Sequence, residues 1–124
     1  MDQIYKEELM EIFKNPKHRG KLADANAGSA GNNPLCGDEI SLKLKITNGI
    51  IEKARFSGSS CAVSVISSEK LLSFVEGKSV GEASELTQED LLKILDINVS
   101  MTRIKCATLV LSALKEALKN YGSN

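Results

Sequence analysis

The stretch EISLKLKITNGIIEKARFS, residues 39–57, determines the fold prediction. Residues 39–46 alternate apolar and polar side chains, which is the pattern of a strand with one buried face. Asn48-Gly49 follows, a dipeptide that favours the two-residue turn of a β-hairpin. Residues 50–57 are predicted to return as the partner strand. The residues predicted for the buried face of that strand are Ile50, Ala54 and Phe56.

Helical patterns surround this predicted hairpin. Apolar side chains recur at helical spacing on both sides of it, and turn or capping residues separate the segments. The predicted helical segments are 3–14, 61–75, 79–84, 88–95 and 103–121. Residues 20–37 are rich in Gly, Ala and Asn and are predicted to be a loop with one short irregular strand. The sequence therefore predicts an α+β fold in one domain, residues 1–124, with a small antiparallel β-sheet and helices packed on one of its faces.

Composition excludes several classes of protein. The chain has 124 residues, of which 42% are hydrophobic, and 16 basic side chains balance 16 acidic ones. A neutral chain argues against general nucleic-acid binding, which calls for a basic surface. We find neither a secretory signal at the start nor an apolar run of roughly 18 residues that could cross a membrane. We therefore expect a cytoplasmic protein with no nucleic-acid or membrane partner.

The three cysteines have unusual surroundings. Cys36 lies in a Pro/Gly turn two residues before Asp38, Cys61 follows Gly-Ser-Ser and opens a predicted helix, and Cys106 lies in the first turn of the last helix. A single cysteine is most often a small buried apolar residue. Two of these, however, are placed at helix N-termini, where the helix dipole favours the thiolate form. An odd number of cysteines in a reducing compartment also leaves thiols free for metal binding or chemistry.

Three thiols and the Asp38 carboxylate make four candidate metal ligands. Three sulfurs and one oxygen can complete a tetrahedral zinc site. They can also hold a small iron–sulfur cluster, which is usually bound by four cysteines. Because a carboxylate suits soft-ligand iron–sulfur sites less well than a thiolate, Asp38 would make a cluster easier to release. The alternative for Asp38 is a turn residue that leads into the strand.

Charged residues near these motifs allow further interpretations. Arg103 and Lys105 precede Cys106 at a predicted helix N-terminus, where the helix dipole disfavours positive charge. Either an anion lies near these two side chains, or both point into water. His18, the single histidine, is predicted to be a solvated surface residue. The segment Gly77-Lys78-Ser79 lacks the upstream glycine of a phosphate-binding loop, so we reject nucleotide binding.

Three segments resemble the IscU/NifU/SufU family of iron–sulfur scaffold proteins. Asn33-Pro34-Leu35-Cys36-Gly37-Asp38 resembles the family's NPxCGD motif. The segments around Cys61 and Cys106, FSGSSCAVS and RIKCA, resemble its second and third cysteine segments.

The resemblance implies a function and a set of ligands. Cys36, Asp38, Cys61 and Cys106 would hold a [2Fe–2S] cluster, or Zn²⁺ as an alternative occupant. A cysteine desulfurase would supply sulfur, with Cys106 as the persulfide acceptor, and recipient apo-proteins would take the finished cluster. A homodimer is compatible with the family. The resemblance thus implies a scaffold or carrier rather than an enzyme.

Two departures separate the chain from single branches of the family. Lys105 stands where IscU proteins have histidine, and the Arg-x-Lys-Cys form resembles SufU, in which zinc binding and sulfur acceptance dominate. The interval between Cys61 and Cys106 is nevertheless as short as in IscU. Residues 99–103 lack the prolines of the segment that a dedicated chaperone recognises in IscU. Both a cluster scaffold and a zinc-bearing sulfur acceptor therefore stay open.

Overall fold

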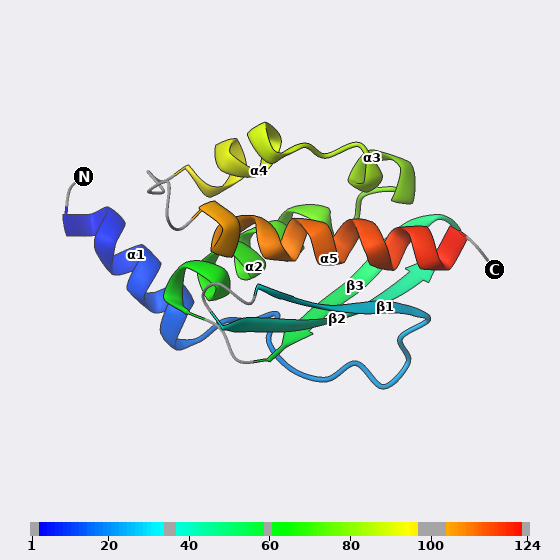
Figure 1. Ribbon diagram of the computed structural model, residues 1–124, viewed down its shortest axis with the longest axis horizontal. Helices are drawn as coiled ribbons and strands as arrows, with labels where there is room; N and C mark the ends of the chain where they lie inside the picture. Colours follow the sequence, from blue (N-terminus) through cyan, green and yellow to red (C-terminus); the bar gives the residue numbers. More distant parts are fainter. Residues whose placement is uncertain (1–2, 34–36, 59–60, 97–103, 123–124) are drawn as a thin grey trace.

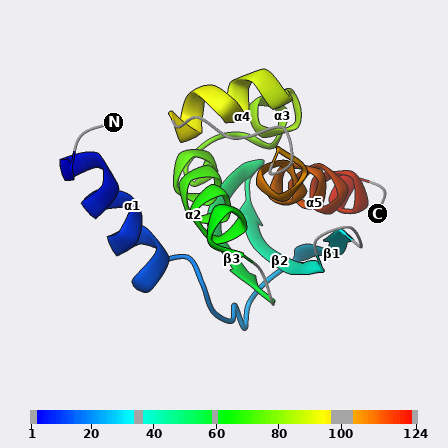
Figure 2. The same cartoon turned by 60° about the vertical axis from the view of Figure 1, so that its left-hand side comes forward.

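The computed structural model describes residues 3–33, 37–58, 61–96 and 104–122 (Figure 1). The fold is a three-stranded antiparallel sheet with helices on one face, as predicted (Figure 2). Its elements, in chain order, are α1 (Gln3–Lys14), β1 (Ala27–Asn33), β2 (Asp38–Thr47), β3 (Ile50–Ser57), α2 (Ala62–Val75), α3 (Val80–Ser84), α4 (Gln88–Leu95) and α5 (Ile104–Gly122).

The β2–β3 hairpin forms at the predicted turn. Asn48 and Gly49 both have positive φ, 54° and 76°, as a type I′ turn requires. The predicted inner face of β3 is wrong at one position, because the strand register shifts between Lys45 and Ile46. This irregularity turns Ile51 into the core, where it is fully buried, and leaves Ile50 40% exposed.

β1 extends further than the short irregular strand that was predicted. It pairs with β2 along its whole length, from Ala27 opposite Leu44 to Asn33 opposite Asp38. Its sequence AGSAGNN has no alternation of apolar and polar residues, so periodicity could not reveal it. Gly28 is needed there, since a Cβ at this position would lie 2.7 Å from the Leu42 carbonyl oxygen.

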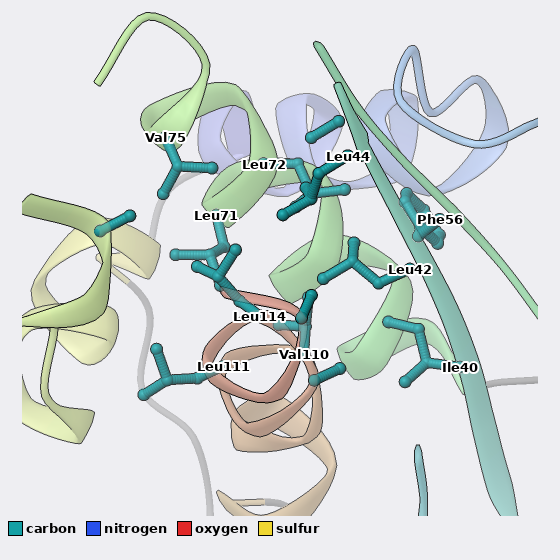
Figure 3. Packing of buried hydrophobic residues seen from close by; sticks show 14 of the residues in the cluster. Ile40, Leu42, Leu44, Phe56, Leu71, Leu72, Val75, Val110, Leu111 and Leu114 are labelled. Atoms are coloured by element: carbon teal, nitrogen blue, oxygen red, sulfur yellow. The ribbon is translucent and has the colours of Figure 1, made fainter. Parts of the chain in front are cut away.

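Two helices cover the sheet and a second group covers those helices. α2 and α5 pack against each other and against the strands, α1 lies beside α2, and α3 and α4 contact these central helices from outside (Figures 1 and 2). Figure 3 shows the core between the sheet, α2 and α5, with Leu42, Phe56, Leu72 and Leu114 among its side chains. Most of α2 is therefore buried, and its buried polar side chains need partners inside the fold.

Helix boundaries follow the capping residues. Thr87 caps α4 in a capping box with Asp90, and Ser79 caps α3 in the same way with Glu82. Among the described helices, we find none whose length and apolar content would let it cross a membrane.

Candidate metal centre

Three elements bring candidate ligands together at one end of the sheet. Asp38 is the first residue of β2, Cys61 is the N-cap of α2, and Cys106 lies in the first turn of α5. One carboxylate oxygen of Asp38 and the two sulfur atoms all lie within 4.8 Å of one another. Cys61 and Cys106, which are 45 positions apart in the sequence, thus meet where α2 packs against α5.

Asp38 is held in place by the beginning of α2. Its Oδ1 atom accepts a hydrogen bond of 3.0 Å from the Cys61 backbone N–H, and its Oδ2 atom accepts one of 2.7 Å from the Ser64 hydroxyl. The Cys61 thiol lies 3.4 Å from the same Oδ2 atom. The side chain of Cys61 itself makes no capping hydrogen bond. Asp38 therefore supplies the anionic cap that the N-terminus of α2 would otherwise lack.

These contacts keep Asp38 ionised. Burial alone raises the pKa of Asp38, whose exposed fraction is only 3%. Hydrogen bonds from the Ser64 hydroxyl, the Cys61 backbone and the thiols of Cys61 and Cys106 outweigh burial, so the pKa lies below its ordinary value. A carboxylate that stays charged is the form that can bind a metal.

The donor set fits a metal that accepts sulfur and oxygen. Zinc binds thiolates at about 2.3 Å and carboxylate oxygens at about 2.0–2.2 Å in tetrahedral sites, which separates neighbouring ligands by roughly 3.3–3.8 Å. Two thiols and a carboxylate within 4.8 Å of one another need only small movements to reach that spacing. Cys36, the fourth predicted ligand, lies outside the described residues.

Of the two basic residues that precede Cys106, the structure describes only Lys105. The side chain of Lys105 is exposed, whereas Cys106 is only 1% exposed. Lys105 therefore faces solvent rather than the group of ligands. Arg103 lies outside the described residues.

Two buried serines of α2 were not identified from the sequence. Ser64 contacts both Asp38 and the backbone carbonyl of Cys106, and Ser67 donates a hydrogen bond to the carbonyl of Ala107. Both side chains are almost completely buried. They join α2 to the first turn of α5 and so hold Cys61 and Cys106 on adjacent elements.

The prediction for His18 was wrong. The side chain is only 11% exposed, and its Nδ1 and Nε2 atoms lie 2.6 Å from Glu69 and 2.7 Å from Glu76. The backbone N–H of His18 also donates to Glu69. The Lys17 and Arg19 neighbours suggested a solvated segment, whereas the tertiary fold presses this segment against α2. His18 is separate from the thiols and ties the chain after α1 to α2.

Glu76 joins this contact to the edge of β3. It accepts hydrogen bonds from the Ala54 backbone N–H at 2.8 Å and from Arg55 at 3.1 Å. Burial raises the pKa of Glu76, but the Ala54 hydrogen bond and the contacts with His18 and Arg55 outweigh it and lower the pKa. The backbone of residues 18–20 also pairs with Phe56. The outer edge of β3 is therefore covered along much of its length.

Comparisons with known proteins show what the whole chain is similar to. The family model described as NifU-like N terminal domain matches residues 4–124. Zinc-dependent sulfurtransferase SufU of Bacillus subtilis is 31% identical, with 100% of this chain and 96% of that protein covered. Iron–sulfur cluster assembly scaffold protein IscU of Thermotoga maritima is 33% identical over 94% of this chain and 93% of that protein. A crystal structure of a proposed SUF-system scaffold protein from Fervidobacterium islandicum has a TM-score of 0.76 at 27% identity, covering 93% and 96% of the two chains.

Proposed function

Because the chain belongs to the NifU-like N-terminal domain family, we propose that it assembles [2Fe–2S] clusters and transfers them to recipient apo-proteins. The observation that carries the proposal is the meeting of Asp38, Cys61 and Cys106 at one end of the sheet. The iron and sulfur are substrates of this process. Cys36 would complete the ligand set, in keeping with the family motif that contains it.

The role of Asp38 follows from its chemistry. A thiolate in its place would hold iron more strongly, because iron–sulfur sites prefer soft ligands. A carboxylate that also caps α2 has a stable position to which it can return when the cluster leaves. We therefore assign Asp38 the role of keeping the cluster transferable.

Sulfur would arrive from a cysteine desulfurase. In our proposal the Cys106 thiolate attacks the outer sulfur of the desulfurase persulfide. The new S–S bond forms on Cys106 as the old one breaks, and the desulfurase cysteine leaves as a thiolate. Cys106 is 1% exposed while Cys61 is half-buried, so delivery to Cys106 requires the bound partner to open the site.

A zinc-bearing sulfur acceptor is the second candidate. Two observations favour it: one sequence relative is a zinc-dependent sulfurtransferase, and Lys105, which replaces the histidine of IscU, faces solvent. A protonated amine cannot replace imidazole as a ligand. In this function Asp38 would be a permanent zinc ligand, and the persulfide would be the product that is handed on.

One experiment separates the two functions. Zinc, iron and acid-labile sulfide are measured in protein purified without oxygen, before and after incubation with ferrous iron, cysteine, a cysteine desulfurase and a thiol reductant. The reductant supplies the electrons that turn persulfide sulfur into sulfide. Equal iron and sulfide, retained better by Asp38→Ala, supports the scaffold. One zinc per chain, no sulfide, and zinc loss in Asp38→Ala supports the sulfur acceptor.

The control variant is Asp90→Asn. Asp90 is also a carboxylate that takes part in capping a helix, but it serves α4 and has no part in the group of thiols. It should leave metal and sulfide content unchanged. Protein that binds neither zinc nor a cluster under these conditions would contradict both candidates.

A further inference from the structure

Ser64 lies at the centre of the hydrogen bonds that surround the candidate metal centre. Its Oγ atom is 2.7 Å from Asp38 Oδ2 and 2.9 Å from the Cys106 carbonyl oxygen. Ser64, Asp38 and Cys106 are all at most 3% exposed. One side chain of α2 therefore contacts the ligand-bearing residues of both β2 and α5.

We infer that Ser64 is a positioning residue that fixes the Asp38 carboxylate as a metal ligand and aligns it with the first turn of α5. This inference rests on the proposed function, because it concerns the same metal centre. Ser64 does not itself bind the metal in this assignment. It acts through Asp38.

The carboxylate geometry supports this role. Oδ1 is held by the Cys61 backbone N–H and Oδ2 by Ser64, so both oxygens have a fixed donor. Each carboxylate oxygen has a second lone pair. Loss of the Cys61 thiol proton, as metal binding would require, would free the Oδ2 lone pair that faces this thiol, and Ser64 would stay in place. The carboxylate can thus bind the metal without losing either fixed donor.

The Cys106 carbonyl, as a second acceptor for the Ser64 hydroxyl, also supports the positioning role. A hydroxyl has one proton, and here two oxygens lie within hydrogen-bond distance of it. If Asp38 shifts as a metal enters or leaves, the proton can turn to the Cys106 carbonyl and is never left without a partner. A buried hydroxyl without an acceptor would oppose such movement.

Ser67 provides a matched control one turn along the same helix. It is fully buried and donates to the Ala107 carbonyl, the residue after Cys106. Ser64→Ala and Ser67→Ala each remove one buried hydroxyl and one contact between α2 and α5. Only Ser64→Ala removes a donor to Asp38.

The test measures binding of Zn²⁺ by chelator competition and of Co²⁺ by its thiolate absorption, with wild type, S64A, S67A and S64T. Partners that orient a metal ligand typically contribute about 10- to 100-fold to affinity. We expect S64A to bind zinc about 10- to 100-fold more weakly, with an altered Co²⁺ spectrum. S67A should resemble wild type, and S64T, which keeps the hydroxyl, should recover most of the affinity.

A second readout needs no metal. In metal-free protein the Cys61 amide is protected from hydrogen exchange by Asp38. S64A should speed exchange of that amide, and S67A should not. Equal zinc affinity in S64A and wild type, or equal losses in S64A and S67A, would overturn the inference. If wild type binds neither Zn²⁺ nor Co²⁺, the zinc-bearing candidate fails, and the iron and sulfide measurement decides the cluster scaffold. The Cys61 amide then alone decides the role of Ser64: unchanged exchange in S64A rejects it.

Discussion

The Asp38 side chain has two tasks that a substitution can separate. As a candidate ligand it faces the thiols, and as a cap it stabilises the N-terminus of α2. Asp38→Asn keeps the size and one oxygen but offers an NH₂ group where Ser64 and the Cys61 thiol now donate. The Ser64 hydroxyl could then donate to the Cys106 carbonyl and accept from this NH₂ group. The Cys61 thiol would lose its acceptor, and the N-terminus of α2 would lose the negative charge beside it.

We predict that Asp38→Asn lowers the free energy of unfolding of the metal-free protein by about 1–2 kcal/mol, because hydrogen bonds to a charged acceptor are stronger than those to a neutral one and the N-terminus of α2 loses its negative charge. Urea unfolding with chelator and reductant present measures it. Asp90→Asn should lose less, because that cap is at the surface. An Asp38→Asn protein as stable as wild type would show that the carboxylate does not cap α2.

Individual residues were predictable where chemistry leaves a local pattern. A Pro/Gly turn before Asp38 and Gly-Ser-Ser before Cys61 are visible in the sequence, and both residues lie in the candidate centre. Ser64 and Ser67 lie in the apolar run AVSVISS, where serines suggest an exposed face. Their partners are carbonyls of α5, about 40 residues away, so only the packed fold reveals their role.

At the scale of elements, two glycines with positive φ have different roles: Gly49 forms a turn, and Gly58 allows the close approach of two strands beside the candidate metal centre. Gly49 forms the hairpin turn, and a Cβ there would meet nothing within 4 Å. Gly58 ends β3 with φ 124°, and a Cβ there would lie 2.4 Å from the carbonyl oxygen of Glu39, the residue after Asp38. A side chain at Gly58 must therefore push the start of β2 away.

We predict that Gly49→Ala lowers the free energy of unfolding by about 1–2 kcal/mol, the cost of left-handed backbone for a residue with a Cβ. Its zinc affinity should equal that of wild type. Gly58→Ala should be less stable than Gly49→Ala and should also bind zinc more weakly, because Asp38 moves with β2. Chemical unfolding and chelator competition measure the two effects. Unchanged zinc affinity in Gly58→Ala would contradict this link.

Elements were predicted well where packing follows periodicity. The alternation of apolar and polar residues in β2 and the helical spacing of apolar residues in α5 match the buried faces of these two elements. The full length of β1 was not predicted, because this strand of Gly, Ala, Ser and Asn is held by its pairing with β2 and its contact with α5 rather than by its own side chains. The prediction of Ile50 rather than Ile51 on the buried face of β3 was wrong, because a change of strand register leaves no mark in the sequence composition.

Over the whole molecule, α2 connects the site to the opposite part of the fold. Its N-terminus meets Asp38, and Glu69 and Glu76 farther along the chain bind His18. The segment after α1, the edge of β3 and the far end of α2 are therefore joined at Glu76, and protonation of this carboxylate should weaken the connection.

The pKa of Glu76 gives the direction of that pH dependence. It is lower in the folded protein than its ordinary value of 4.5, so the native state favours the charged carboxylate. The resulting stability is fully present above about pH 4.5 and is lost as pH falls through the lowered folded pKa. Glu76→Gln cannot titrate and lacks this contribution. We predict that the difference in free energy of unfolding between wild type and Glu76→Gln is largest near neutral pH and shrinks as the pH falls below about 4.5.

Urea unfolding at a series of pH values measures this difference, with Glu85→Gln as the control for removing one exposed carboxylate. Asp38 has a pKa shifted in the same direction, so wild type and both variants share its acid-induced loss, and it cancels in the comparison. Amide exchange of Ala54, whose N–H binds Glu76, should increase in Glu76→Gln at neutral pH. A difference that stays constant from neutral to acid pH would mean that Glu76 contributes by shape alone. In that case charge would have no part in holding the segment at His18 to α2.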